Sequence, residues 1–371
     1  MILVITLILT ILYGIFLAWC NYHWGKIENT SEMIIGDASI KVAVIVPVRN
    51  EAKNISSFIE SFLSQNYPKE NCELIICDDH STDNTFVIAQ STLKSKNILN
   101  GCVIESTGKY KKEAIEHAIS KTNAELIITA DCDITAGREW ISSIVAAFVR
   151  SNAYMLCCPV SIKSGDNIIE KIQAIEFAGL IGIGAAGIQA HQPIMCNGAN
   201  LAFVRKIFNE VGGYSNSKSE SGDDTQLMLK IDRKHPGRIA FVKDSRAVVF
   251  THAISEFSEL WNQRKRWASK IPLTLSAFTI SIAILAWLVH SFLLIHLLFG
   301  FRQASFLVLL LPWMIKIAAE MKFLKSINSF YCEKTPFWLI IGIQPFYCLY
   351  VVATGIISPF AKFKWKGREL R

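Results

Sequence analysis

The stretch "ELIITADCD", residues 125–133, combines the pattern of a buried strand with two acidic residues. It is an apolar run of strand character that ends abruptly in two carboxylates, Asp131 and Asp133, with one residue between them. Aspartate is common in the turns that follow strands, so the pair could be ordinary turn residues. Two carboxylates at the tip of a buried strand also suit a divalent cation that holds a phosphate. The stretch alone leaves both interpretations open.

Segments of strand and helix character alternate on both sides of this stretch. Strands are predicted for apolar runs rich in valine and isoleucine, at residues 41–48, 72–77, 101–106, 125–130 and 153–160. Between them, apolar residues recur at helical spacing, in residues 54–68, from residue 81 onward, around 114–119 and around 140–148. Strands that are apolar on both faces and separated by amphipathic helices predict an α/β fold, with helices on both faces of a mostly parallel sheet.

Polar clusters follow three of the predicted strands. They are "PVRNE" at residues 47–51, "CDDHSTDNT" at 77–85 and "ADCD" at 130–133. In parallel α/β sheets, ligands bind beyond the carboxyl ends of the strands, so we expect the three clusters at one edge. This shared position favours a metal and phosphate site over three unrelated turns.

Long uncharged blocks predict an integral membrane protein. They are residues 1–22, residues 271–289 with an apolar continuation to 301, and residues 336–361. Each could cross a hydrocarbon core of about 30 Å, which takes about 20 helical residues. A shorter block at 303–315 contains Pro312 and predicts a weak or re-entrant span. We expect an uncleaved anchor at 1–22, because this block lacks the positively charged start of a signal peptide. We expect two or three spans within 271–361.

The net charge of +7 is concentrated next to the apolar blocks. Basic residues crowd "NQRKRWASK" at 262–270 and the tail at 362–371, which favours the cytoplasmic side for both. We therefore expect an even number of crossings after the soluble part and a cytoplasmic Arg371. A nucleic-acid partner would need a basic groove, whereas these basic clusters flank the apolar blocks, so no nucleic-acid partner is expected. The ten cysteines show no C-x-x-C pair or zinc-like spacing, which indicates reduced thiols.

Six motifs together resemble the family 2 glycosyltransferases in their order and rough spacing. They are "VIVPVRNE", "DDHSTDNT", "TADCD", "CNGANLAFVR", "SGDDTQL" and "QRKRW". Within that family the chain is most similar to the membrane-embedded branch, which includes cellulose, chitin and hyaluronan synthases and several lipid glycosyltransferases. The resemblance covers about residues 40–270. It implies a GT-A catalytic domain there, a nucleotide-diphosphate sugar donor, a Mg²⁺ or Mn²⁺ ion, and inversion at the anomeric carbon.

The resemblance also implies which residues hold the donor and the metal ion. Asp133 would ligate the metal, with Asp131 as its partner on the metal or the donor sugar, because a hard cation prefers carboxylate oxygens. Pro47 and Glu51 would line the nucleotide pocket, and Asp79 would bind the base.

Two neighbours of these donor residues leave alternatives open. Asp78 could instead cap a helix that starts near Ser81. In "GKYKKEAIEHA" we place Lys112 at the donor, although Lys109 or Lys111 could take that place, and a solvated helix face is an equal alternative.

The transfer step needs a base that takes the proton of the acceptor hydroxyl. The acid pair of the family corresponds to Asp223 and Asp224, with Asp224 as the base. The alternative is an acid pair favoured by a helix dipole, which does not exclude catalysis. The loop "CNGAN" matches an acceptor site, to which it would contribute Asn197, Gly198 and Asn200; a simple glycine turn is its alternative.

The segment "QRKRW", residues 263–267, is expected at the membrane face of the active site. Gln263, Arg264 and Arg266 would contact the diphosphate, because guanidinium groups suit phosphate oxygens. Trp267 would stack under the acceptor sugar. The alternative is an interfacial anchor, since tryptophan and arginine are common at membrane borders.

These expectations combine into one predicted activity. The chain would be an inverting, metal-dependent glycosyltransferase of the cytoplasmic membrane, with its catalytic domain in the cytoplasm. It would transfer a sugar, with UDP as the nucleotide that the resemblance favours, to a lipid or lipid-linked acceptor. A processive polysaccharide synthase is the runner-up, because three or four apolar segments are few to line a pore. A non-catalytic scaffold or transporter is a weaker alternative, since the acid set is intact.

Overall fold

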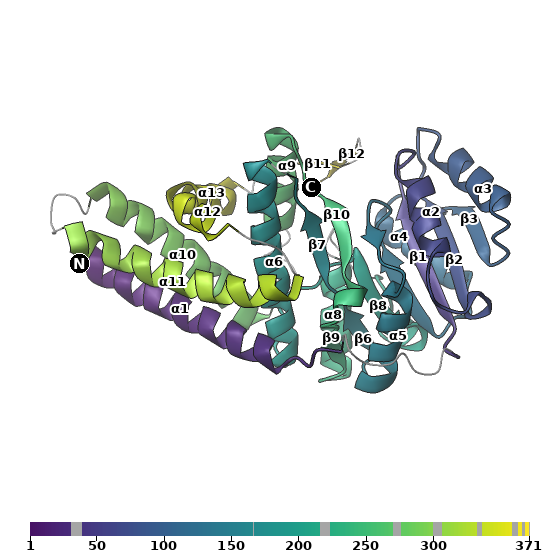
Figure 1. The fold of residues 1–371 in the computed structure, drawn as a ribbon, viewed down its shortest axis with the longest axis horizontal. Coiled ribbons are helices and arrows are strands. Elements are labelled where there is room, and N and C mark those ends of the chain that lie inside the picture. The colour runs from purple at the N-terminus through teal and green to yellow at the C-terminus, as the bar shows by residue number, and fades with distance from the viewer. Residues whose placement is uncertain are drawn as a thin grey trace. The chain divides into compact units, whose positions relative to one another are not determined.

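The computed structural model describes residues 1–30, 39–165, 167–215, 223–269, 276–299, 306–331, 336–357, 363–365 and 368–370. They divide into two compact units, an α/β unit and a helical unit, whose elements are labelled in Figure 1. The α/β unit comprises Ile27–Lys163 and Gly187–His252. The helical unit comprises Met1–Lys26, Ser164–Ala186 and Ala253–Arg371.

The α/β unit is built on a mostly parallel sheet, as predicted. Its strands run in the order β3-β2-β1-β4-β8-β6-β9. Their bounds are β1 Val42–Val48, β2 Cys72–Asp78, β3 Gly101–Glu105, β4 Leu126–Ala130, β6 Met155–Cys157, β8 Asn200–Val204 and β9 Ile239–Phe241. The first four strands in this order are parallel, and β6 is parallel to β9, whereas β8 runs antiparallel to both of its neighbours. Strands β1 and β4 are almost entirely buried, which explains why they lack a polar face in the sequence.

Helices connect the parallel strands at the predicted places. They are α2 (Ile55–Leu63), α3 (Thr85–Ser95), α4 (Lys111–Ser120) and α5 (Trp140–Ser151). Two more helices, α7 (Arg205–Glu210) and α8 (Asp223–Lys234), follow the antiparallel strand β8. Short 3₁₀ turns occur at Lys69–Asn71 and Ser245–Ala247. Two predicted boundaries are wrong. Helix α2 ends at Leu63, five residues before Pro68. Helix α3 begins at Thr85, four residues after Ser81, because a side-chain-bonded turn occupies residues 81–84.

The predicted strand at 153–160 is in fact two strands in two sheets. Strand β6 ends at Cys157, and β7 (Val160–Lys163) joins a small second sheet with β5 (Thr135–Ala136) and β10 (Val249–His252). The chain changes sheets at Cys158 and Pro159. Proline has no backbone N–H to continue a ladder, which accounts for the break at this point.

The helical unit contains several long helices (Figure 1). Its elements are α1 (Ile2–Lys26), most of α6 (Ile168–Gln189), α9 (Phe257–Ser269), α10 (Ala277–Phe299), α11 (Phe306–Tyr331), α12 (Phe337–Gly342), α13 (Gln344–Ile357), β11 (Phe363–Trp365) and β12 (Arg368–Leu370). Helix α1 packs along α10 and α11. Within the described part of the chain, α1, α6 and α10 are long and apolar enough to cross a membrane.

The assignment of α6 to the helical unit was not predicted. Residues 164–186 fall inside the range 40–270 that we expected to form the catalytic domain, yet they cluster with the apolar helices. A Cβ atom at Gly182 would come within 2.6 Å of the Ile327 side chain on α11, so glycine lets that side chain lie against the α6 backbone. Glycine permits such an approach between apolar helices.

The C-terminal apolar blocks also differ in detail from the prediction. Residues 306–315 of the weak fourth block are the start of α11, which continues past Pro312 to Tyr331. The last block forms two helices that are interrupted at Ile343. Residues 271–275, 303–305, 358–362 and Arg371 lie outside the described residues, so the number of spans and the side of the basic tail stay predictions.

Buried polar side chains connect α1, α11 and α13. Lys316, which is fully buried, lies 2.7 Å from Glu320 and donates to the side-chain oxygen of Gln344 at 2.5 Å. Gln344 donates to the other oxygen of Glu320 at 2.8 Å, and the Tyr13 hydroxyl donates to Glu320 at 3.1 Å. Charges in such apolar surroundings are tolerated when they are paired and hydrogen-bonded.

We expect Lys316→Met to destabilise the helical unit by about 3–5 kcal/mol, because it leaves the Glu320 carboxylate buried without its counter-charge. Thermal unfolding in lipid nanodiscs would measure the loss. Lys322→Met, at an exposed position of the same helix, is the matched control and should change little. The double variant Lys316→Met/Glu320→Gln should recover part of the loss, and equal losses in Lys316→Met and Lys322→Met would contradict the expectation.

Candidate active site

Four chain segments meet at one edge of the large sheet. Strands β2, β1 and β4 are neighbours and parallel, with Val48 opposite Asp78, so their carboxyl ends lie at the same edge. Strand β8 is antiparallel to β4 and pairs Asn200 with Ala130, which brings the loop before β8 to that edge as well. The edge therefore carries residues 47–51, 78–85, 131–133 and 196–199, and the three polar clusters gather as predicted.

Asp131 contacts Lys111, one of the two alternatives to Lys112 that the sequence offered. Its side chain is 37% exposed, and its Oδ1 lies 2.5 Å from the Nζ of Lys111, the first residue of α4. Burial would lower the pKa of Lys111, but the Asp131 carboxylate raises it above the ordinary value, and the Asp223–Asp224 pair acts in the same direction. The predicted lysine, Lys112, has its Nζ 3.9 Å from Glu113 instead. The structure thus brings Lys111 to the site, and the place of Lys112 at the donor stays a prediction.

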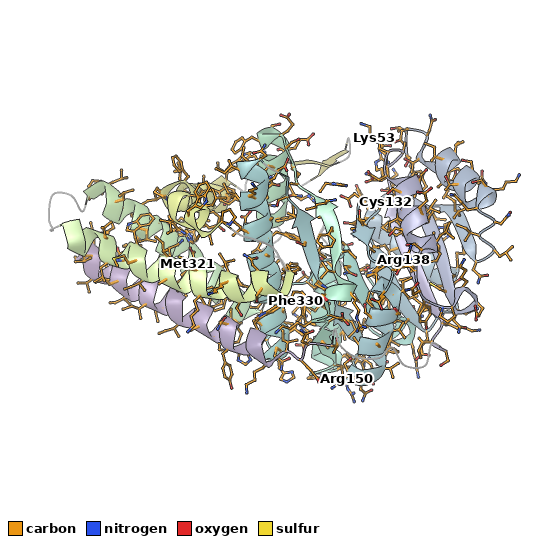
Figure 2. The ribbon with its side chains drawn as sticks, viewed as in Figure 1. Lys53, Cys132, Arg138, Arg150, Met321 and Phe330 are labelled. Carbon is orange, nitrogen blue, oxygen red and sulfur yellow. The ribbon has the colours of Figure 1, made fainter. Side chains whose placement is uncertain are left out.

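Asp133 receives a hydrogen bond from the small sheet. The Thr251 hydroxyl of β10 donates to its Oδ2 at 3.2 Å. Cys132, labelled in Figure 2, separates the two acids and is buried. Carboxylate oxygens are suitable ligands for Mg²⁺ or Mn²⁺. The described residues contain no cluster of three or more His, Cys, Asp or Glu side chains that could hold a metal ion, so a cation here would need further oxygen ligands from phosphate or water.

Asp224 contacts the predicted acceptor loop. It lies in the first turn of α8, where its Oδ2 accepts from the backbone N–H of Gly198 at 2.9 Å and its Oδ1 accepts from that of Thr225 at 2.8 Å. A Cβ atom at Gly198 would lie 3.4 Å from the Asp224 carboxylate, an ordinary van der Waals distance, so the loop and the acid are in direct contact. Asp223 is the first residue of the same helix, and Ser221 and Gly222 of the motif lie outside the described residues.

Buried groups beside the acid pair respond to its negative charge. Burial raises the pKa of the Tyr214 hydroxyl well above its ordinary value, and the Asp223–Asp224 pair raises it further. Burial likewise raises the pKa of the Cys196 thiol, with smaller contributions from Cys157 and Asp224. Both groups therefore stay neutral and add no competing charge next to the acids.

The predicted acceptor contact of Asn200 does not fit the structure. Its side chain is fully buried, and its Oδ1 accepts from the indole N–H of Trp140 at 3.0 Å. Its Nδ2 donates to the carbonyl oxygens of Pro159 at 2.8 Å and Ala247 at 2.9 Å. The amide thus joins three segments of the α/β unit and has a structural role. Asn197 accepts from the backbone N–H of Ala199 and stays a candidate together with Gly198.

The two acids after β2 have different environments. Asp78 accepts from the backbone N–H of Ser81 at 2.9 Å and from its hydroxyl at 2.5 Å, so it stabilises the turn. Asp79 is 2% exposed, and its backbone N–H donates to Val48 at 2.8 Å. The carboxylate of Asp78 is therefore engaged in the turn, and the contact of Asp79 with the base stays a prediction. Arg49, which was not predicted, donates to the carbonyl oxygen of Asp79 at 2.7 Å and fixes this loop.

The first-strand residues of the predicted pocket lie next to that loop. Pro47 is part of β1. The backbone N–H of Glu51 donates to the Thr85 hydroxyl at 2.7 Å, and its carboxylate accepts from Asn54 at 2.7 Å. Glu51 therefore connects the end of β1 to the start of α3.

The segment "QRKRW" lies on α9 of the helical unit, and one of its predicted contacts does not fit. Arg264 is 4% exposed and donates from Nε and Nη2 to Glu176, at 3.1 and 2.6 Å, and from Nη1 to Gln263 at 2.6 Å. These bonds occupy the guanidinium that was expected to bind diphosphate. The contacts of Gln263, Arg266 and Trp267 with donor or acceptor stay predictions, because these residues belong to a different compact unit from the carboxylates.

Comparison with known families gives the domain its identity. Residues 43–212, which contain β1, β2, β4 and β8, match the model described as "Glycosyl transferase family 2". These residues form a family 2 glycosyltransferase domain. The resemblance stated from the motifs is thereby confirmed, and the fold is GT-A.

Curated relatives of the domain are distant. The chain is 23% identical over 234 residues to the probable glycosyltransferase YdaM of Bacillus subtilis, which covers 62% of this chain and 54% of that protein. It is 23% identical over 256 residues to the beta-monoglucosyldiacylglycerol synthase of Synechocystis, which covers 65% of this chain and 50% of that protein. The chain thus spans about half the length of these two relatives.

A solved structure agrees with the fold along nearly the whole chain. It is the mannosyltransferase PcManGT from Pyrobaculum calidifontis in complex with GDP-Man and Mn²⁺. The TM-score is 0.60 at 17% sequence identity, and the alignment covers 97% of this chain and 99% of that one. At this identity the likeness concerns the fold alone.

Proposed function

We propose that the chain is an inverting, metal-dependent glycosyltransferase that moves a sugar from a nucleotide-diphosphate donor to a lipid or lipid-linked acceptor in the membrane. The observation that carries the proposal is the sheet edge with two sets of acids, Asp131 and Asp133 after β4 and the Asp223–Asp224 pair at α8. The Asp224 carboxylate accepts from Gly198 in the loop before β8, and that loop and the acids after β4 lie at the same edge of the sheet.

The donor end of the site would use the acids after β4. A Mg²⁺ or Mn²⁺ ion bound there would neutralise the negative charge that develops on the departing nucleoside diphosphate. Asp133, oriented by the Thr251 hydroxyl, and Asp131, oriented by Lys111, are the residues that would hold it. Asp79 and Glu51 would bind the nucleoside at the ends of β2 and β1. A manganese ion accompanies the donor in the Pyrobaculum structure, which supports the use of a divalent metal.

The acceptor end would use Asp224 as the general base. Its carboxylate would take the proton of the acceptor hydroxyl while that oxygen forms the new bond to the anomeric carbon. The bond between that carbon and the diphosphate breaks on the opposite face, so the configuration inverts and the nucleoside diphosphate leaves. Backbone N–H groups of Gly198 and Thr225 orient the carboxylate for this step. Gly198 and Asn197 would border the acceptor.

A membrane acceptor agrees with the apolar helices of the chain. Helices α1, α6 and α10 could each cross a membrane, which suggests membrane association. The Synechocystis relative is named for a glycolipid product, which supports a lipid acceptor. We further propose a multi-pass protein of the cytoplasmic membrane with its catalytic domain in the cytoplasm. A processive polysaccharide synthase is the second candidate, and a product of many sugar units would favour it.

Nucleotide release from a panel of UDP- and GDP-sugars tests the proposal. The purified protein would be assayed in nanodiscs with vesicles of total lipid extract and with Mn²⁺, Mg²⁺ or chelator. Both nucleotides are included because the Pyrobaculum structure holds a GDP-sugar, whereas the sequence resemblance favours UDP. We expect release from one donor that requires the metal and produces a labelled lipid. The absence of both release and nucleotide binding across the panel would refute the proposal.

A further inference from the structure

The buried contacts of Arg264 give this residue a different role from the predicted one. Its guanidinium donates to Glu176 and to Gln263 and lies 4.3 Å from the centre of the Trp267 ring. Gln263 and Trp267 are two of the residues that were expected to contact the substrates. Arg264 therefore touches both of them and is itself anchored by a carboxylate on another helix.

Helix α6 supplies that anchor from a single face. Gln173, Glu176 and Phe177 are three and four residues apart, a spacing that places side chains on one side of a helix. The Gln173 amide bonds both backbone groups of Ile254, at 2.7 and 3.1 Å, three residues before α9 begins. The ring centre of Phe177 lies 5.9 Å from that of Trp267. One face of α6 thus contacts the segment before α9 as well as Arg264 and Trp267 of α9.

We propose that Glu176 and Arg264 are positioning residues that hold Trp267, the residue expected to stack under the acceptor sugar, and that neither binds the diphosphate. This inference rests on the proposed function. Two features support it: the guanidinium is 4% exposed, and the fork that would grip a phosphate is already bonded to Glu176. An arginine in this arrangement orients neighbours through rigid hydrogen bonds and stacking. Removing either partner leaves a buried charge uncompensated, so both side chains should matter equally.

The test compares Glu176→Gln, Arg264→Gln and the double variant in nanodiscs. Transfer would be followed as nucleotide release while the amount of lipid-extract vesicles is varied, and binding of UDP and GDP with Mn²⁺ would be measured separately. We expect each single variant to lower transfer per vesicle lipid by about 10- to 100-fold, since small misplacements of positioning groups have effects of this size. Nucleotide binding should change by less than about twofold, and the double variant should be no worse than the worse single variant.

Three further measurements make the result unambiguous. Glu259→Gln, at an exposed position of α9, is the matched control and should leave transfer unchanged. Arg264→Lys keeps the charge without the fork, and it should also lose transfer; it replaces Arg264→Gln if that variant fails to fold. Wild-type release and its loss in Asp133→Asn are measured in the same series. If the transferase proposal fails, the wild type will release no nucleotide. If only the positioning role fails, the wild type will still release nucleotide.

Two outcomes would overturn the inference. One is weakened nucleotide binding in Arg264→Gln with unchanged transfer and binding in Glu176→Gln, which would make Arg264 a diphosphate ligand. The other is additive losses in the double variant, which would mean that the two side chains act separately.

Discussion

Asp224→Asn is expected to lower sugar transfer by about 10²- to 10⁴-fold, the range that a positioned general base contributes. Asparagine has nearly the same shape but cannot accept the proton of the acceptor hydroxyl. Donor binding should persist, because the nucleotide would be held at the ends of β1 and β2. Initial rates of nucleotide release at saturating donor, together with nucleotide binding, would measure the two effects separately.

A change of structure must be distinguished from the loss of the base. Asp224 accepts two backbone N–H bonds, whereas an asparagine side chain offers one acceptor oxygen, so one bond of about 1 kcal/mol would be lost. Thermal unfolding would show whether the effect stays that small. Asp232→Asn makes the same chemical change about two turns further along α8 and should retain full activity. If Asp224→Asn keeps more than about a tenth of the wild-type rate, the base must be sought elsewhere.

The sheet and its functional edge could be predicted because the relevant information is local. Strands buried on both faces are continuous apolar runs, and the polar clusters follow them directly in the sequence. Parallel strands in one sheet then place their carboxyl ends together without any knowledge of distant contacts. The position of the loop 196–199 was predicted by resemblance, and the antiparallel pairing of β8 with β4 explains it.

The predictions that did not fit depend on contacts between residues far apart in the chain. Asn200 looks like a polar loop residue in the sequence, yet its partners are 41 to 60 residues away. Arg264 has the right chemistry for phosphate, but its guanidinium is hydrogen-bonded to Glu176, which lies 88 residues earlier in the chain. The choice between Lys111 and Lys112 depends on where α4 begins, because one residue turns a helix by about 100°. No local pattern contains this information.

Asp133→Asn is expected to reduce transfer by about 10²- to 10⁴-fold at a fixed Mn²⁺ concentration. The reason is that an amide oxygen is a weaker ligand than a carboxylate for a hard cation, and a bound metal contributes several kcal/mol of charge stabilisation in such reactions, at about 1.4 kcal/mol per tenfold. The measurement is nucleotide release as a function of Mn²⁺ and Mg²⁺. The concentration for half-maximal rate should rise, and a chelator should abolish the wild-type activity.

Thr251→Val tests, in the same metal titration, a residue that orients Asp133 without itself binding the metal. It removes the Thr251 hydroxyl that donates to Asp133, and leaves the carboxylate itself in place. Groups that orient a metal ligand typically change metal affinity by about 10- to 100-fold, so the half-maximal metal concentration should rise while the rate at saturating metal recovers. In Asp133→Asn the rate should stay low even at saturating metal. If wild-type release continues unchanged in chelator, the acids after β4 serve the sugar or the turn, and the metal would have no part in the reaction.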